Sequence, residues 1–251
     1  ALTQDPEVVE RFRREALLAA RLSHPNIVNI YDIAGRFGLI WYTMELIDGQ
    51  RFDRWVRPQG ALDVARLRAA LPQLCEGIAA IHAASKLHRD LKPSNVLVTS
   101  DGRLVVLDFG LAIDPELGGV GQTVMDGSVS GTAEYMAPEQ AAGSPATRSS
   151  DFYAVGAMLF EALTGRLPFD GRTHEILTDK QRSDAPRASG LSTTSVPADL
   201  DRLCETLLAR DPAARPNIAA LRAALDYTAT GSEAGPLRRS NPVPRMAASS
   251  L

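Results

Sequence analysis

Two stretches organise this chain: His88-Arg89-Asp90-Leu91-Lys92-Pro93-Ser94-Asn95 and the later triplet Asp108-Phe109-Gly110. Between them, residues 96–98 and 104–107 are apolar, and an Asp-Gly pair separates the two runs. This pattern predicts a hairpin of two short strands. A hairpin brings its ends together, so we expect the amide that ends the first block and the carboxylate that begins the second to face one point.

The two blocks read H-R-D-L-K-x-x-N and D-F-G, and they resemble the catalytic motifs of a serine/threonine protein kinase of the bacterial type. The resemblance implies an α+β, two-lobed protein kinase-like fold with an incomplete N-terminal lobe and a mainly α-helical C-terminal lobe. It implies transfer of the γ-phosphoryl group of ATP to protein Ser and Thr hydroxyls, with ATP and Mg²⁺ as cofactors. Lys92 is typical of serine/threonine kinases, whereas tyrosine kinases carry Ala-Ala-Arg in this stretch.

The resemblance assigns a catalytic or metal-binding role to five residues. Asp90 would accept or orient the hydroxyl proton of the substrate, and Lys92 would offset the charge of the transferring phosphoryl group. Asn95 and Asp108 would supply oxygen ligands for Mg²⁺. Asn95 is therefore both a residue of the catalytic loop and a metal ligand in this resemblance. Thr132, near the end of the following segment, would contact Asp90 and Lys92.

Nucleotide binding is assigned to a second group of residues. Met44 matches the gatekeeper position, although it also reads as an ordinary buried strand residue. Glu15 matches the glutamate of the first helix, although its spacing alone is that of an exposed helical Glu. The backbone of Glu45, Leu46 and Ile47 would meet the adenine. Leu97 would form the floor beneath the adenine ring.

Three further matches predict structural contacts. Asp151, in Ser-Asp-Phe-Tyr-Ala-Val-Gly, matches the aspartate that anchors the catalytic-loop backbone from below. Glu139, in Ala-Pro-Glu, and Arg215, in Arg-Asp-Pro-Ala-Ala-Arg-Pro, match a buried ion pair between the activation segment and the late helices. Alone, Arg215 reads as a solvated cation near a helix start.

Arg89 precedes the catalytic Asp, as it does in kinases that are switched on by phosphorylation of the activation loop. A phosphate adds about −1.5 to −2 charge, which such an arginine can bind. Residues 111–136 are rich in Gly, Ser and Thr and predict a long functional or disordered loop. We therefore expect autophosphorylation there, at Thr123 first and otherwise at Ser128 or Ser130; the alternative is that these are solvated loop hydroxyls.

Composition narrows the remaining possibilities. The 251 residues carry a net charge of −3, which gives no electrostatic reason to expect nucleic acid or an acidic membrane as partner. No apolar run approaches the ~18–20 residues that span a bilayer, and we see no signal peptide. Cys75 and Cys204 lie in apolar helical patterns and are expected to be buried free thiols in a reducing cytoplasm, with a disulfide as the alternative.

The predicted organisation has three parts. Residues 1–48 form the remnant of an N-terminal lobe, residues 49–226 a C-terminal lobe, and residues 227–251 a disordered tail or linker. The first part contains a helix at 5–22 and strands at 26–32 and 39–46, with a turn between Gly35 and Gly38. Further helices are predicted at 52–56, 63–85, 151–164, 172–181, 198–209 and 218–225, with a mobile loop at 183–197.

The chain also lacks two parts of the kinase pattern. No G-x-G-x-x-G loop and no V-A-x-K precede Glu15, so the resemblance covers about residues 7–226 and the chain is expected to be N-terminally truncated. We therefore expect these residues alone to bind ATP poorly and to phosphorylate weakly. A further domain fused after the tail is possible by analogy with bacterial kinases.

Two other functions remain open at this point. A pseudokinase would keep the fold as a scaffold or binding module, but it would have no chemical need for Asp90, Lys92, Asn95 and Asp108 together. A small-molecule kinase could share the fold, but the Ala-Pro-Glu block and its arginine partner fit an extended protein substrate better.

Overall fold

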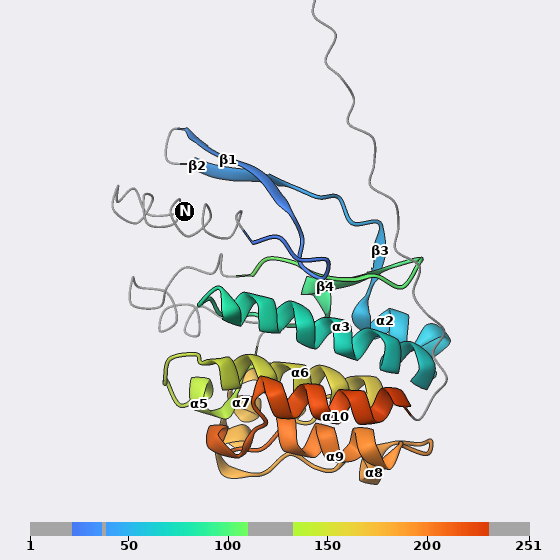
Figure 1. Ribbon diagram of the computed structural model, residues 1–251. Coiled ribbons are helices and arrows are strands. Elements are labelled where there is room, and N and C mark those ends of the chain that lie inside the picture. The colour runs from blue at the N-terminus through green and yellow to red at the C-terminus, as the bar shows by residue number, and fades with distance from the viewer. Residues whose placement is uncertain (1–21, 37–38, 110–132, 231–251) are drawn as a thin grey trace, which may run out of the picture.

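The computed structural model describes residues 22–36, 39–109 and 133–230, and shows small antiparallel sheets above a larger layer of helices (Figure 1). This confirms the predicted α+β architecture with a mainly helical C-terminal part. The predicted helix at 5–22 lies outside the described residues except for its last position, as do most of the loop at 111–136 and the tail after residue 230.

The upper layer begins with an antiparallel hairpin, β1 (Ile30–Arg36) and β2 (Leu39–Met44). The prediction placed its first strand at 26–32, which is wrong by four residues at both ends, and Gly35 pairs within the ladder instead of starting the turn. Residues 26–28, of which Ile27 and Val28 are apolar, run along another strand, where Val28 N donates to Val106 O at 3.0 Å. An apolar run shows that a strand-like segment is buried, but not which neighbour it pairs with.

A three-stranded antiparallel sheet lies beneath that hairpin, with the order β3 (Gly49–Arg51), β4 (Val96–Thr99) and β5 (Leu104–Val106). The predicted hairpin between the two motif blocks is β4–β5, and Gly102 takes the positive φ of 85° that its turn requires. Strand β3 was not predicted. Its three residues are all exposed, so no alternation of apolar and polar side chains marks it.

Two long helices form the centre of the lower layer. Helix α3 (Val64–Ala83) begins at Asp63, whose side chain accepts a hydrogen bond from Arg66 N at 3.0 Å, and contains Pro72. Almost every residue of α6 (Arg148–Thr164) is buried, as expected of a helix that is apolar all round. It ends at Gly165, which has φ 74° and closes the helix in the left-handed conformation.

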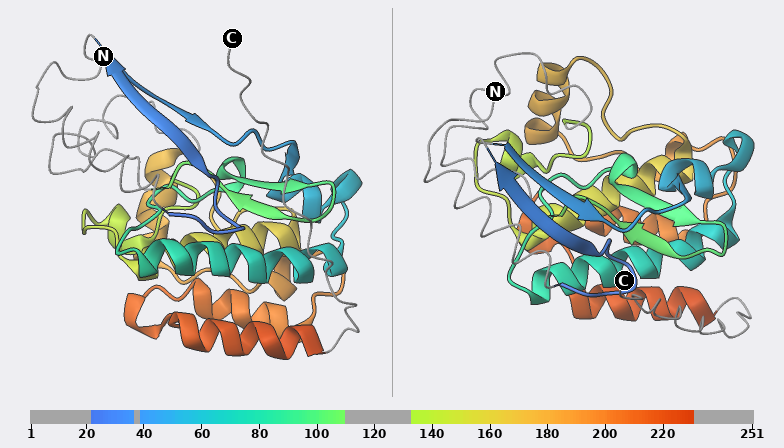
Figure 2. Two further views of the ribbon diagram at one scale, coloured as in Figure 1. Left: turned by 45° about the horizontal axis from the view of Figure 1, so that its top comes forward. Right: turned by 90° about the horizontal axis from the view of Figure 1, so that it is seen from above.

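The remaining helices pack against α3, α6 or one another; the left view of Figure 2 shows the helical layer below the sheets, and its right view looks down on the sheets from above. Gly156 of α6 lets α9 (Ala198–Leu207) approach closely, because a Cβ there would lie 2.8 Å from Cβ of Leu207. The predicted mobile loop at 183–197 contains a helical turn, α8, so that prediction was partly wrong. The bounds are α2 (Phe52–Val56), α5 (Pro138–Ala141), α7 (Thr173–Arg182), α8 (Ala188–Leu191), α9 (Ala198–Leu207) and α10 (Ile218–Thr230).

The core confirms the predicted state of the cysteines. Cys75 and Cys204 are both buried free thiols, and burial raises the pKa of each. Among the described residues, none of the helices is both long and apolar enough to cross a bilayer.

Candidate active site

The catalytic loop brings three predicted residues together. Lys92 Nζ lies 2.7 Å from Asp90 Oδ2. Asn95 Nδ2 donates to Asp90 O at 2.8 Å and to its Oδ2 at 3.3 Å. The 3₁₀ turn Pro93–Asn95 carries the amide into β4, so a carboxylate, an ammonium group and an amide share one short segment.

Asp151 holds this loop from below. Its buried carboxylate accepts hydrogen bonds from His88 N at 2.9 Å and from Arg89 N at 3.0 Å. Arg89 has a φ of 70°, a conformation that is costly for a residue with a Cβ and needs such support. A third bond, from Nε2 of His82 at 2.8 Å, was missed from the sequence because a histidine at a helix end gives no distinct signal.

His88 ties the loop to the second block. Its fully buried ring places Nε2 at 3.0 Å from Leu107 O, so Nε2–H donates to that carbonyl. Burial lowers the pKa of His88, and the charge of Asp151 opposes this effect without reversing it. The imidazole is therefore neutral near pH 7 and serves as a hydrogen-bond spacer between the two motif blocks.

The second block lies beside the first, as the hairpin predicts. Leu107 N donates to Asn95 O at 2.8 Å, which brings Asp108 to the same end of the sheet as the amide. Asp108 has φ 52° and is exposed, whereas Phe109 is buried in the core.

Tyr42 of β2 reaches the same carboxylate, which sequence reasoning missed. Its hydroxyl donates to Asp108 Oδ1 at 2.9 Å. Burial, together with the hydrogen bond to Asp108, raises the pKa of Tyr42 to about 12, so the phenol remains a donor at neutral pH. A tyrosine in a predicted strand is ordinarily assigned to packing, and only the tertiary structure shows this contact.

The oxygen donors of the site fit Mg²⁺. Asp108 offers an exposed carboxylate, and Asn95 adds an amide oxygen nearby. Within the described residues no cluster of three or more His, Cys, Asp or Glu forms an all-protein metal cage. This donor set suits Mg²⁺, which is commonly held by one or two protein side chains together with phosphate oxygens and water.

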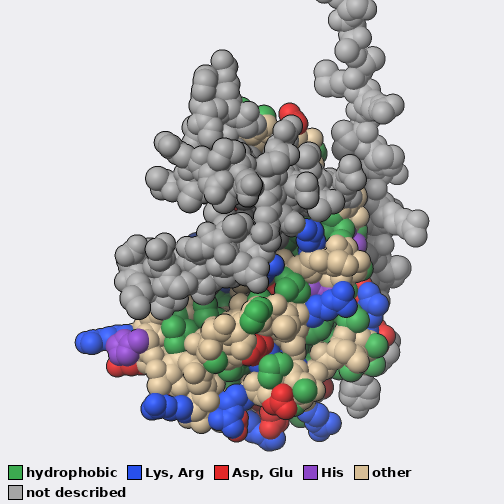
Figure 3. Space-filling view, turned by 90° about the vertical axis from the view of Figure 1, so that its left-hand side faces the viewer, with side chains coloured by type: hydrophobic (Ala, Val, Ile, Leu, Met, Phe, Trp, Pro, Cys, Tyr) green, Lys and Arg blue, Asp and Glu red, His purple; other side chains and the backbone are tan. Residues whose placement is uncertain are grey.

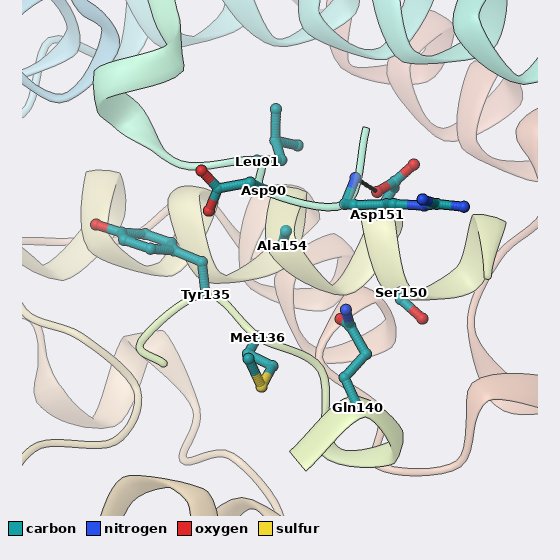
Figure 4. Close-up of a pocket in the computed structure, with 9 residues that line it drawn as sticks. Asp90, Leu91, Tyr135, Met136, Gln140, Ser150, Asp151 and Ala154 are labelled. Carbon is teal, nitrogen blue, oxygen red and sulfur yellow. Dashed lines mark hydrogen bonds between the residues drawn. The ribbon is translucent and has the colours of Figure 1, made fainter. Parts of the chain in front are cut away.

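A small pocket opens between the catalytic loop, the segment before α5 and helix α6 (Figure 4). The close-up shows Asp90 and Asp151 along its upper side, with the side chains of the later segment below. The residues that line this pocket include Asp90 and Leu91 of the loop, Tyr135, Met136 and Gln140 of the later segment, and Asp151 of α6.

The segment before α5 is anchored to the late helices. Arg215 donates from Nη1 to Glu139 Oε1 at 2.7 Å and from Nη2 to Oε2 at 2.8 Å. The side chain of Arg215 is 0% exposed and that of Glu139 13%. Burial would raise the pKa of Glu139, but the hydrogen bonds from Arg215 and Ser150 outweigh it and the pKa is lowered.

The predicted adenine-binding segment is largely exposed. Leu46 is 94% exposed and Met44 40%, so the reading of Met44 as a buried strand residue is wrong. Glu45 is fixed instead, because Arg103 Nη1 donates to its Oε1 at 2.7 Å and its own N–H donates to Asn29 O at 2.8 Å.

The other two residues of that group, Ile47 and Leu97, are half-buried. Ile47 packs against the hydrophobic core, and Leu97 pairs with Val105 in the β4–β5 ladder. The predicted site residues that lie outside the described part of the chain are Glu15, Thr123, Ser128, Ser130 and Thr132.

The chain matches the model of the protein kinase domain over residues 2–225. It is 37% identical over 209 residues to the serine/threonine-protein kinase PrkC of Bacillus subtilis, covering 83% of this chain and 32% of PrkC. It is 34% identical over 218 residues to PknA of Mycobacterium tuberculosis, covering 85% of this chain and 49% of PknA. The serine/threonine-protein kinase PkaA of Streptomyces coelicolor is 35% identical over 233 residues, covering 92% of this chain and 42% of PkaA.

The chain therefore spans between a third and a half of the length of these relatives. The family match covers nearly all of it, including both motif blocks, the Ala-Pro-Glu block and the arginine that pairs with its glutamate. On this ground the chain belongs to the protein kinase domain family and is similar to bacterial serine/threonine kinases.

Proposed function

We propose that this chain is the catalytic domain of a serine/threonine protein kinase, which transfers the γ-phosphoryl group of ATP to Ser or Thr hydroxyls of protein substrates. The observation that carries the proposal is the position of Lys92 and Asn95 within hydrogen-bonding reach of the Asp90 carboxylate. The whole loop is fixed by the buried Asp151, which suits a reaction that depends on positioning and charge stabilisation.

Each residue has one task in this mechanism. Asp90 accepts or orients the proton of the attacking hydroxyl, and Lys92 offsets negative charge on the transferred group. Asn95 and Asp108 would hold Mg²⁺, which would offset the negative charge of the ATP phosphates. Tyr42 orients the Asp108 carboxylate through the hydrogen bond that its hydroxyl donates.

The segment beside Asp90 suits a protein substrate better than a small molecule. Residues 133–139 form a continuous segment from the pocket beside Asp90 to the ion pair with Arg215, a length that suits an extended peptide. Figure 3 views the molecule from the side of α5 and α7, where hydrophobic side chains lie among charged ones of both signs. The relatives carry the names of serine/threonine-protein kinases, which supports the same substrate class here.

The assignments of the nucleotide site and of the domains belong to this proposal. ATP would bind where Met44, the backbone of residues 45–47 and Leu97 meet the catalytic loop, with Glu15 as part of the same site. Residues 1–48 would belong to the N-terminal lobe and 49–226 to the C-terminal lobe. Because α10 (Ile218–Thr230) runs four residues past that boundary, the linker, to which a further domain could be joined, would begin after Thr230 and not at the predicted residue 227. We place the activity in the cytoplasm, since the buried free thiols suit a reducing compartment.

The test compares two proteins. We expect the product translated from the natural start codon to phosphorylate a generic protein substrate in the presence of Mg·ATP, and to leave small alcohols and sugars unmodified. The 251-residue chain alone should be slower by at least ~10², because no Gly-rich loop or V-A-x-K in it holds the phosphates. Radiolabelled phosphate transfer measures both rates; fast transfer by residues 1–251 alone would contradict the second expectation, and transfer to sugars only would contradict the proposed substrate class.

Regulation by the activation segment is part of the same proposal. Arg89 is exposed beside the catalytic Asp90, where it could bind a phosphate carried by Thr123, Ser128 or Ser130. We expect phosphopeptide mapping of the active enzyme to find phosphate between residues 111 and 131, first on Thr123. An active enzyme that is unmodified throughout that stretch would exclude this mode of activation.

A further inference from the structure

Lys180 of α7 is a buried cation that the proposed mechanism does not use. Its side chain is fully buried, and Nζ donates to Ala133 O at 2.7 Å, Glu134 O at 2.6 Å and Met136 O at 2.8 Å. The three acceptors lie within four consecutive residues, directly before the Ala-Pro-Glu block. An ammonium group has three donors, so this one segment of backbone satisfies all of them.

The groups around the Lys180 ammonium have opposing effects on its charge. Nζ lies 5.4 Å from the centre of the Tyr153 ring, which offers its electron-rich face to a positive charge. Burial lowers the pKa of Lys180 to about 7, and the charge of Glu134 acts in the opposite direction. An apolar side chain would avoid this desolvation cost, so packing alone does not explain a lysine here.

The segment that Lys180 binds is the one that faces the catalytic carboxylate. Tyr135 and Met136 line the same pocket as Asp90 (Figure 4). The segment is held from a second side as well, since Tyr135 Oη donates to Glu161 Oε2 of α6 at 2.7 Å. Two helices, α6 and α7, therefore fix residues 133–136 relative to the catalytic loop.

We propose that Lys180 is a positioning residue for the protein substrate, which fixes backbone residues 133–136 as the surface on which the peptide docks beside Asp90. The inference rests on the proposed kinase function and extends it to one residue that no motif marks. Lys180 contacts the docking segment and not the predicted nucleotide site. Its loss should therefore weaken productive peptide binding and leave the binding of Mg·ATP unchanged.

The first experiment measures substrate kinetics of Lys180→Met in the product translated from the natural start codon. Methionine is close in length and suits a helix, but it leaves the three carbonyls without their donor. We expect kcat/KM for a peptide substrate to fall by about 10- to 100-fold, because small displacements of a positioned substrate cost rates of this order. The KM for Mg·ATP should stay within about twofold of the wild-type value, which separates positioning from general damage.

Gln181→Met is the matched control. Gln181 follows on the same helix and donates from an exposed position to Ala141 O of α5 at 3.1 Å, outside the docking segment. We expect it to retain wild-type kinetics for both substrates. Equal losses for peptide and Mg·ATP in Lys180→Met, or the same peptide defect in Gln181→Met, would overturn the assignment.

A second measurement does not depend on activity. Hydrogen exchange of the backbone amides should increase in residues 133–137 of Lys180→Met and stay unchanged in α3 (Val64–Ala83). Unchanged exchange in the segment, or an increase throughout the chain, would overturn the role of Lys180. A wild-type protein that transfers no phosphate would instead refute the proposed function, and the exchange data would still decide whether Lys180 fixes the segment.

Discussion

Replacing Asp90 by asparagine should lower kcat for protein phosphorylation by about 10²–10⁴, the range expected for loss of a positioned general base. Asparagine keeps the shape of the side chain and an oxygen that can accept from Asn95, but it cannot take up the hydroxyl proton. The contact with Lys92 at 2.7 Å also loses its charge complement. Initial rates at saturating Mg·ATP and peptide measure the effect in the product translated from the natural start codon.

Asp101→Asn is the control for this substitution. Asp101 lies in the turn of the same β4–β5 hairpin, is exposed, and would undergo the same chemical change away from the catalytic loop. We expect its kcat to stay within about twofold of the wild type. A similar rate for Asp90→Asn and the wild type would refute the assignment of Asp90 as the base and favour the scaffold function instead.

The candidate site could be predicted largely because its residues are local in sequence. Asp90, Lys92 and Asn95 occupy one loop, and the short hairpin after them leaves few places for Asp108. The contacts of Asp151 with the loop span more than 60 residues and came from the family resemblance alone. Spacing and hydrophobic periodicity do not indicate that Asp151 contacts the catalytic loop.

The features that sequence reasoning missed all depend on tertiary structure. Tyr42 and Lys180 occur in a strand and a helix where their types are common, so nothing in the local pattern marks the hydrogen bonds they make. Strand β3 (Gly49–Arg51) is exposed and too short for alternation to be visible. The exposure of Met44 depends on what packs over β2, which the periodicity of the strand itself does not determine.

Replacing Arg215 by methionine should lower the free energy of unfolding by about 3–5 kcal/mol, because it leaves the partly buried Glu139 without its partner. The loss extends beyond the ion pair. The guanidinium also donates to the backbone carbonyls of Ser149, Ala209 and Arg210, which would lose those bonds. Urea denaturation followed by circular dichroism measures the change, with the midpoint and slope compared between variants.

The expected loss of stability in Arg215→Met depends on the burial of its ion pair with Glu139. Two further variants test this dependence. Arg187 pairs with Glu205 at 2.8 Å but the two side chains are 64% and 47% exposed, so Arg187→Met should destabilise the fold far less than Arg215→Met. Replacing both partners, Glu139→Leu with Arg215→Met, should recover much of the loss, since no charge is then left unpaired. Equal costs for the buried and exposed arginines would mean that the pair between Glu139 and Arg215 does not stabilise the fold.

Acid should reduce the cost of Arg215→Met. The pKa of Glu139 is lower in the folded protein than in the unfolded chain, so its ion pair contributes stability that is present above the ordinary glutamate pKa of about 4.3 and is lost as the pH falls further. Once the carboxyl is protonated, the wild type no longer gains from Arg215 as a charge partner. The difference in unfolding free energy between wild type and variant should therefore be largest near pH 7 and shrink below pH ~4. A difference that is constant across this range would assign the stabilisation to the backbone carbonyl bonds of Arg215 instead of to its charge.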